Sequence, residues 1–181
     1  MDPTTNAAPS VPSTPSTTGD LSGRLTVRRP SASDGAAMWR VARDSGELDL
    51  NSSYAYLLLA QHFADTCRVA LDGDLVVGFV SGYRLPEDAA HLFVWQVAVD
   101  ESARGLGIAG RMLDDLVDET SGVTTLETTV AEDNVASRRL FARWAARRGA
   151  AITSRPLFTA SQFPDSHVDE PLLVIAGLTP R

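Results

Sequence analysis

The chain has 181 residues, 44% of them hydrophobic, a formal net charge of -7 and one cysteine. This composition fits one folded domain and excludes fibrous proteins, disulfide-rich domains and cysteine-rich zinc sites. All 16 basic residues are arginines, so lysine Schiff-base chemistry and phosphate-loop ATPases are excluded as well. The acidic balance argues against nucleic acid as a partner. Because the sequence shows neither a membrane span nor a signal peptide, we expect a cytoplasmic protein that does not bind membranes.

Two regions are expected to carry no chemistry. Residues 1–23 are rich in proline, serine and threonine and nearly devoid of large apolar side chains. Such a segment cannot offset the entropy lost on ordering, so we predict a disordered tail before one domain over residues 24–181. Cys67 lies in "TCRVALD", a context that predicts a half-buried strand thiol rather than a nucleophile.

Hydrophobic periodicity and turn residues predict the elements of the domain. In chain order these are a strand over 24–30, helices over 31–44 and 53–65, a hairpin over 66–84, a strand over 91–100, a helix from Gly107, a strand over 124–130, a helix over 134–149 and terminal strands, the last over 171–178. Ser31 and Asp34 are typical of a helix start, and Asp72-Gly73 is a strong hairpin turn signal. This order predicts an α/β or α+β domain with a mixed sheet.

The stretch from Leu92 to Leu116 runs from a strand through a polar turn into a helix. Arg104 precedes two glycines, Gly105 and Gly107, at the predicted helix start. Glycines let the backbone expose several N–H groups to one anion, and a helix N-terminus adds partial positive charge. We interpret the turn as a pyrophosphate cradle, to which Arg111 could add charge. The alternative is a tight turn that needs glycine for its geometry alone.

Two short motifs resemble those of a known family. "RGLGIA", Arg104 to Ala109, matches the motif Arg/Gln-x-x-Gly-x-Gly/Ala of the GCN5-related N-acetyltransferases. "NVASRRLF", Asn134 to Phe141, is similar to the family's second motif, Asn-x-x-Ser/Ala-x-x-Leu-Tyr/Phe. The resemblance covers about residues 24–178 on the spacing of the elements. It implies a mixed, mostly antiparallel sheet flanked by about four helices, with acetyl-CoA as co-substrate and no metal.

Three longer segments, over residues 48–67, 92–113 and 126–145, resemble the diaminobutyrate acetyltransferases of the ectoine pathway. Those enzymes transfer acetyl from acetyl-CoA to the γ-amine of L-2,4-diaminobutyrate, which implies a role in osmoadaptation. The segment 48–67 carries the substrate assignment. The resemblance also implies a homodimer.

The resemblance assigns cofactor-binding roles residue by residue. Main-chain groups of Val97 and Val99 would pair with the pantetheine arm, where the strand over 91–100 splays from its neighbour. An amide near Val97 would also donate to the thioester oxygen during catalysis. The remaining cofactor-binding residues are expected to be Arg104, Gly105, Leu106, Gly107, Ile108, Ala109, Asn134 and Ser137. Asn134 suits a helix N-cap equally well.

Phe141 departs from the family, since many members have a tyrosine there that protonates the departing thiolate. A thiol of pKa about 8.5 can leave unprotonated, whereas an ammonium of pKa about 10.4 must lose a proton before it attacks. A carboxylate or an ordered water must therefore act as base. Asp49 and Glu127 are the first candidates and Glu170 is a third. Glu127 alternates with Leu126, so it could point into a sheet cleft.

The diamino acid needs an anion near its amines and donors for its carboxylate. Asp49 is our first choice for the anion, because apolar neighbours would leave its charge less screened. The other candidate substrate contacts are Tyr54, Trp95, His167 and Glu170. Each has an ordinary structural alternative, such as core packing for Trp95 and Tyr54 or a polar loop for His167 and Glu170.

Two other functions stay open at this point. One is a different acetyltransferase of the same fold, acting on another small amine or on protein N-termini. The other is a non-catalytic sensor that binds acyl-CoA without turnover.

Overall fold

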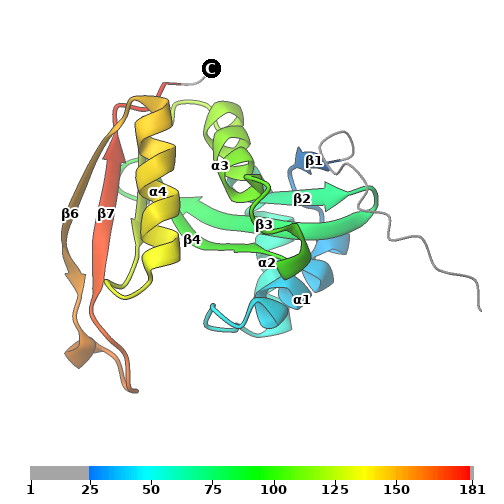
Figure 1. The fold of residues 1–181 in the computed structure, drawn as a ribbon, viewed down its shortest axis with the longest axis horizontal. Helices are drawn as coiled ribbons and strands as arrows, with labels where there is room; N and C mark the ends of the chain where they lie inside the picture. The colour runs from blue at the N-terminus through cyan, green and yellow to red at the C-terminus, as the bar shows by residue number, and fades with distance from the viewer. Residues whose placement is uncertain (1–24, 180–181) are drawn as a thin grey trace, which may run out of the picture.

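The computed structural model describes residues 25–179 (Figure 1). The tail expected over 1–23 lies outside this range. The helices and strands follow the predicted order: β1 Leu25–Arg28, α1 Gly35–Ser45, α2 Ser53–His62, β2 Arg68–Asp72, β3 Leu75–Arg84, β4 His91–Val99, α3 Ile108–Glu119, β5 Thr125–Thr129, α4 Val135–Arg148, β6 Ala151–Phe158 and β7 Glu170–Ala176. None of the helices in this range is long and apolar enough to cross a membrane.

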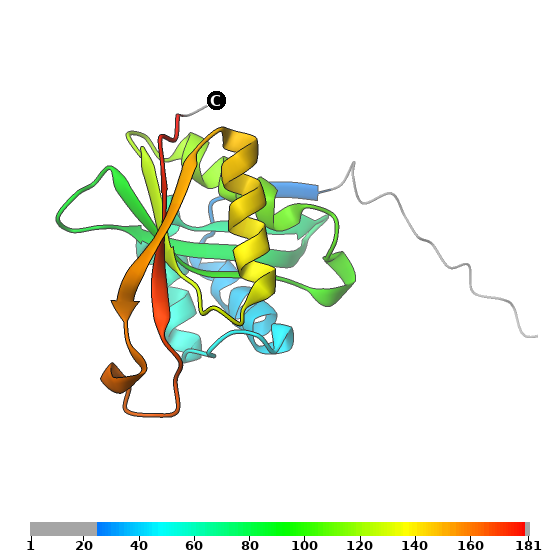
Figure 2. The same ribbon diagram turned by 60° about the vertical axis from the view of Figure 1, so that its left-hand side comes forward.

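One seven-stranded sheet runs through the molecule in the order β1-β2-β3-β4-β5-β7-β6. All neighbours are antiparallel except β4 and β5, which are parallel. Helices α1 and α2 lie on one side of the sheet and α3 and α4 on the other (Figures 1 and 2). Helices α1 and α2 share one buried cluster with β2 and β3, and α3 and α4 share another with the strands of the sheet. The predicted mixed, mostly antiparallel sheet with flanking helices is therefore confirmed.

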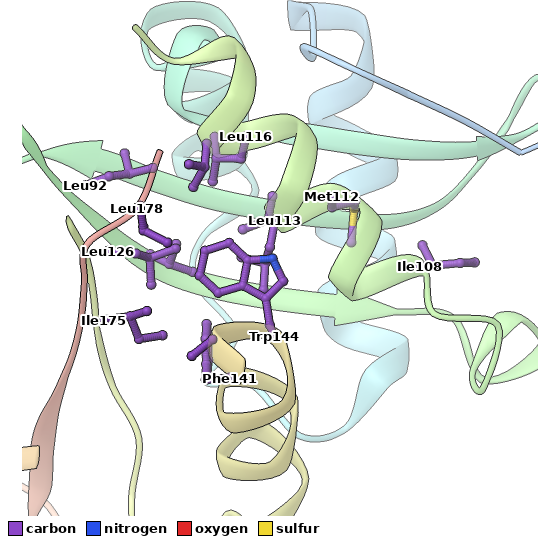
Figure 3. Packing of buried hydrophobic residues seen from close by; sticks show 14 of the residues in the cluster. Leu92, Ile108, Met112, Leu113, Leu116, Leu126, Phe141, Trp144, Ile175 and Leu178 are labelled. Carbon is purple, nitrogen blue, oxygen red and sulfur yellow. The ribbon is translucent and has the colours of Figure 1, made fainter. Parts of the chain in front are cut away.

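The larger cluster fixes α4 against α3. Trp144 is 1% exposed and packs beside Phe141 of the same helix and Leu113 of α3 (Figure 3). Its indole Nε1–H donates to Asp114 of α3 at 2.9 Å, so the one polar atom of this ring is satisfied. This packing holds α3 and α4 side by side, an arrangement on which the first cavity described below depends.

Short-range signals set the helix ends as predicted. Ser31 and Asp34 form a capping box before α1, and the Asn134 side chain accepts from the Ser137 N–H at 3.0 Å at the start of α4. Gly149 ends α4 in the left-handed region. Cys67 is wholly buried just before β2 rather than half-buried. Burial raises the pKa of its thiol to about 11, so the thiolate form is scarce at neutral pH.

A bulge in β4 decides which side chains face the functional site. Gly82 pairs with Val94 and Ser81 with Gln96, so Trp95 is the extra residue of β4. An extra residue reverses the alternation of side chains beyond it. As a result Val94 packs in the cluster of α3 and α4, whereas Ala98 packs in the cluster of α1 and α2.

The parallel neighbours β4 and β5 separate early. They pair only from His91 to Phe93 on β4, opposite Thr125 to Glu127 on β5. Beyond this point β4 continues to Val99 without a β5 partner. The splay expected for this strand is therefore present, and it leaves main-chain groups of β4 free to bind an extended ligand.

Candidate active site

The first cavity lies between the end of β4, the turn before α3, and α4. Its volume is about 510 Å³. Of the predicted cofactor-binding residues, those that line it are Val97, Val99, Arg104, Gly105, Gly107, Ile108, Ala109 and Ser137. Leu106 does not line this cavity, and its side chain is about half exposed.

The turn before α3 has the properties of an anion site. Gly105 and Gly107 have φ of +80° and +73°, a region that side chains disfavour, and a Cβ added at either would meet nothing within 4 Å. Gly107 is the N-cap of α3 and offers no side chain to its first N–H groups. The first turn of α3 also carries no acidic residue. The residues that carry these uncapped amides line the first cavity, where the amides can bind an anion.

Of the two arginines expected to add charge to this turn, Arg104 lines the first cavity and Arg111 does not. The Arg104 guanidinium pairs with Glu47 at 3.2 Å and donates to the Ser45 carbonyl at 3.3 Å, which ties the turn to the loop after α1. It still lines the first cavity. Arg111 donates to the Leu25 carbonyl at 3.2 Å and does not line the cavity, so the suggestion that it adds charge there was wrong. The spacing of four residues from Gly107 predicts the side of α3 on which Arg111 lies, but it does not determine which group its guanidinium contacts.

A second cavity of about 760 Å³ opens beside the first. The residues that line both cavities are Glu47, Leu48, Val97 and Ser137. Segments distant in sequence build the second one: the loop after α1, helix α2, strand β3, the splayed part of β4, the end of β5, the start of α4 and the connection from β6 to β7. Val97 on β4 thus lies where the two cavities meet.

Glu170 and Asp49 bring negative charge to the second cavity. Glu170, at the start of β7, is partly buried, and this desolvation raises the pKa of its carboxyl group above the usual value. A hydrogen bond from Thr129 opposes that effect. The side chain of Asp49 is 90% exposed, so the expectation that apolar neighbours shield its charge was wrong. Of the two carboxylates, Glu170 is thus the more buried.

His167 connects two of the loops that frame the second cavity. Its Nε2 lies 3.6 Å from the Asp49 carboxylate, and its ring stacks on Phe163 at a centroid distance of 4.2 Å. His167, Phe163 and Asp49 all line the cavity. Trp95, the bulged residue of β4, also lines it and is 47% exposed, so core packing is not its role.

Two predicted site residues lie elsewhere. Glu127 lines neither cavity. It is 6% exposed and its Oε1 lies 2.7 Å from His91 Nδ1, a contact that occupies the carboxylate at the far end of β4. Tyr54 is 66% exposed and also lines neither cavity. The structure therefore does not bring Glu127 or Tyr54 to the site.

The motif residues of α4 contribute at its first turns. Asn134 lines the second cavity and also caps α4, so the role of N-cap is compatible with a role in ligand binding. Phe141 is 3% exposed and lines the second cavity as well. No hydroxyl therefore stands at this position of the site.

Sequence reasoning missed Gln96, a buried residue of β4. Its Nε2 donates to the Asp49 carbonyl at 2.9 Å, and its Oε1 accepts from the Tyr56 hydroxyl at 3.0 Å. Gln96 thereby anchors the loop that carries Asp49 to the sheet and to α2. A polar residue inside an apolar strand run was the available signal, but the bulge that turns it toward α2 could not be seen in the sequence.

Comparison with known proteins agrees with this geometry. A model of the acetyltransferase (GNAT) family matches residues 36–145, which include both the turn before α3 and most of α4. The chain belongs to this family. An L-2,4-diaminobutyric acid acetyltransferase of Streptomyces coelicolor is 49% identical over 160 residues, covering 86% of this chain and 94% of the relative. One from Halomonas elongata is 42% identical, covering 87% and 83% of the two chains.

Solved structures give the same picture. The diaminobutyrate acetyltransferase EctA from Paenibacillus lautus, solved in complex with its substrate L-2,4-diaminobutyric acid and coenzyme A, superposes with a TM-score of 0.82 at 45% identity. It covers 87% of this chain and 97% of its own. Ard1 from Thermoplasma volcanium, at a TM-score of 0.69 and 20% identity, shares the fold. Within the GNAT family, the chain groups with the diaminobutyric acid acetyltransferases.

Proposed function

We propose that this protein transfers acetyl from acetyl-CoA to the γ-amine of L-2,4-diaminobutyrate, giving N-γ-acetyl-diaminobutyrate for ectoine formation and hence osmoadaptation. The observation that carries the proposal is the pair of joined cavities. One presents uncapped backbone amides and the other presents carboxylates, and they meet at Val97. Similarity to diaminobutyric acid acetyltransferases over 86–87% of the chain supports the same substrate.

The first cavity would hold acetyl-CoA, which supplies the thioester. The amides from Gly105 to Ala109 would bind the pyrophosphate, because a helix N-terminus favours anions. The pantetheine arm would lie along β4, beyond the last residue that pairs with β5. A backbone N–H near Val97 would then donate to the thioester oxygen as negative charge develops on it.

The second cavity would hold the diamino acid and take up its proton. Asp49 would attract an ammonium group, and Glu170, with its raised pKa, would accept the proton of the attacking amine. The freed amine attacks the carbonyl carbon, a C–N bond forms and the C–S bond breaks. Because Phe141 cannot donate a proton, coenzyme A would leave as a thiolate.

The loop of Asp49 must be held for this arrangement to work. Gln96 fixes its backbone from the sheet side, and Arg104 reaches it through Glu47 and Ser45. We therefore assign Gln96 a positioning role. Trp95 and His167, with the stacked Phe163, would enclose the carbon chain and the carboxylate of the substrate.

We also infer a cytoplasmic homodimer. Apolar side chains are exposed on and around α2: Leu50, Tyr54, Leu57, Leu58 and Phe63. Such a group of exposed apolar side chains is typical of a surface that a partner covers. A second copy of the chain is the simplest partner, and light scattering on the purified protein would test for a mass of two chains.

Thiol release from acetyl-CoA tests the proposed function and separates its alternatives. We expect rapid release with L-2,4-diaminobutyrate and much slower release with ornithine, polyamines and N-terminal peptides. Two-dimensional NMR of the product should place the acetyl group on the γ-nitrogen. Preferred turnover of another amine would indicate a different acetyltransferase, and binding of acetyl-CoA without turnover of any amine would indicate a sensor.

A further inference from the structure

We propose that Arg139 and Arg143 of α4 form a second anion site in the first cavity and bind the phosphate monoester on the ribose of coenzyme A. Both residues line this cavity. The inference rests on the proposed use of acetyl-CoA and adds a determinant of cofactor choice. It distinguishes coenzyme A from its dephospho form, which retains the pyrophosphate and pantetheine arm but lacks this monoester.

Arg139 and Arg143 form no ion pair with another residue of the described part of the chain. Neither side chain has a hydrogen bond or a carboxylate partner among residues 25–179, and both residues are exposed. Further along the same helix, Arg147 pairs with Asp114 at 2.6 Å and Arg148 with Asp118 at 2.6 Å. In a chain of net charge -7, two adjacent guanidinium groups without carboxylates at a cavity rim indicate an anionic ligand.

The spacing along α4 brings the two arginines to one ligand. Residues four apart lie on the same side of a helix, with Cβ atoms about 5–6 Å apart. The next residue in this row is Arg147, whose guanidinium lies 3.4 Å from the carbonyl of Gly110 in the first turn of α3. The row therefore starts beside the pyrophosphate cradle and extends away from it along α4.

Arg139 marks the outer end of this row. It lines the first cavity and also a shallow groove on the other side of α4, so it stands on the rim between them. A phosphate held at the rim would lie near solvent, in the same cavity as the turn before α3. A coenzyme A molecule with its pantetheine arm along β4 and its pyrophosphate at the turn before α3 would lie in this same cavity, so its ribose phosphate would lie in the cavity or at its rim.

The chemistry of the monoester fits a pair of arginines. A phosphate monoester carries about -1.5 to -2 charge at neutral pH and three acceptor oxygens. Guanidinium groups bind such oxygens in pairs, which makes each contact geometrically specific. The uncapped amides of the α3 turn are expected to be occupied by the pyrophosphate, so the monoester requires separate donors.

Calorimetric titration of the full-length protein with coenzyme A and with dephospho-coenzyme A tests this site. We expect the wild type to bind coenzyme A about tenfold more tightly, a preference of about 1.4 kcal/mol. In the double variant Arg139→Gln/Arg143→Gln this preference should fall to about twofold or less, while the dissociation constant of dephospho-coenzyme A stays within about twofold. Arg138→Gln is the matched control, since Arg138 neighbours the pair on α4 but does not line the first cavity.

Two results would overturn the inference. An unchanged preference in the double variant would mean that other donors bind the monoester. Equal weakening of both ligands would assign the two arginines to the pyrophosphate instead. Failure of the wild type to bind either form would contradict the proposed function itself, so the two proposals fail in different ways. Circular dichroism melting of each variant checks that the fold is kept.

Discussion

The two cavities of the site differ in how the chain builds them. The first is made largely of one continuous turn and the facing side of α4, and backbone amides give it its binding character. The second draws side chains from seven separate parts of the chain. A cofactor can be held by a local motif, whereas selection of one amine requires side chains that only the tertiary fold assembles.

Substitution of the proposed base, Glu170, is the sharpest test of this difference between the two cavities. Glu170→Gln keeps the shape of the side chain but removes its capacity to accept a proton. We expect kcat/KM for L-2,4-diaminobutyrate to fall about 100-fold or more, the usual range for the loss of a general base. The rate of thiol release over a range of pH measures the effect.

Glu127→Gln is the counterpart of that variant. Its carboxylate pairs with His91 and lines neither cavity, so kcat/KM should change little even if the melting temperature falls. A large loss of activity in a folded Glu127→Gln protein, with Glu170→Gln active, would reverse the assignment of the base.

The backbone character of the first cavity predicts the next largest effect. The double variant Arg104→Ala/Gly107→Ala removes one charge and places a Cβ where the ligand would lie. We expect the KM for acetyl-CoA to rise about tenfold or more, as for the loss of one charge-assisted contact. Steady-state kinetics at saturating amine measures this change.

Gly73→Ala gives the matched control for backbone strain. Gly73 has φ of +60° in the β2–β3 turn and, like Gly107, has open space around an added Cβ. Its replacement should lower stability to a similar extent as Gly107→Ala without altering the KM for acetyl-CoA. If both glycine variants weaken acetyl-CoA binding equally, general loss of stability explains the effect rather than the cradle.

Asp34 provides a prediction outside both cavities. Its hydrogen bond with Arg28 lowers the pKa of the Asp34 carboxyl to about 2, below the ordinary value of 3.8. A lowered pKa stabilises the fold above about pH 4, and this stabilisation is lost as the pH falls toward 2. Because Arg28 is 45% exposed, we expect Asp34→Asn to lower the free energy of unfolding by only about 1–2 kcal/mol at pH 7.

Urea denaturation at pH 7 and at pH 3 measures the contribution of the Asp34 carboxylate to the free energy of unfolding. The difference in the free energy of unfolding between wild type and Asp34→Asn should be smaller at pH 3 than at pH 7. An equal difference at both values would show that the variant acts through lost packing or capping rather than through the charge of the carboxylate.

The smallest effect on catalysis is expected at Phe141. Phe141→Tyr adds the hydroxyl that many family members carry, at a position that lines the second cavity. If the thiolate leaves without a general acid, kcat should rise by no more than about twofold. A large rise, with a new titration on the alkaline side of the pH profile, would show that protonation of the leaving group had limited the rate.

The contrast between the cavities also explains what the sequence could predict. The turn at Gly107, the cap at Asn134 and the hairpin at Gly73 depend on neighbours a few residues away, and the structure places each as predicted. Their signals are the left-handed backbone of glycine and the short polar side chain of a cap. These features are determined by residues that are close together in the sequence, so they can be predicted from it.

The second cavity depended on information that no local window holds. Alternation placed Glu127 on one side of its strand but could not reveal His91, 36 residues away, as its partner. The apolar neighbours of Asp49 suggested burial, yet the loop leaves its carboxylate in solvent. Gln96 was missed because the bulge at Trp95 changes the side of the sheet that it faces.

Calorimetric titration of the double variant Asp49→Asn/Glu170→Gln tests the division between the cavities most directly. The variant removes the carboxylates of Asp49 and Glu170 from the second cavity, and neither residue lines the first. We predict that the heat of L-2,4-diaminobutyrate binding disappears, while the dissociation constant of coenzyme A stays within about twofold of the wild type. Retained binding of the diamino acid, or equal weakening of both ligands in a folded protein, would contradict the account.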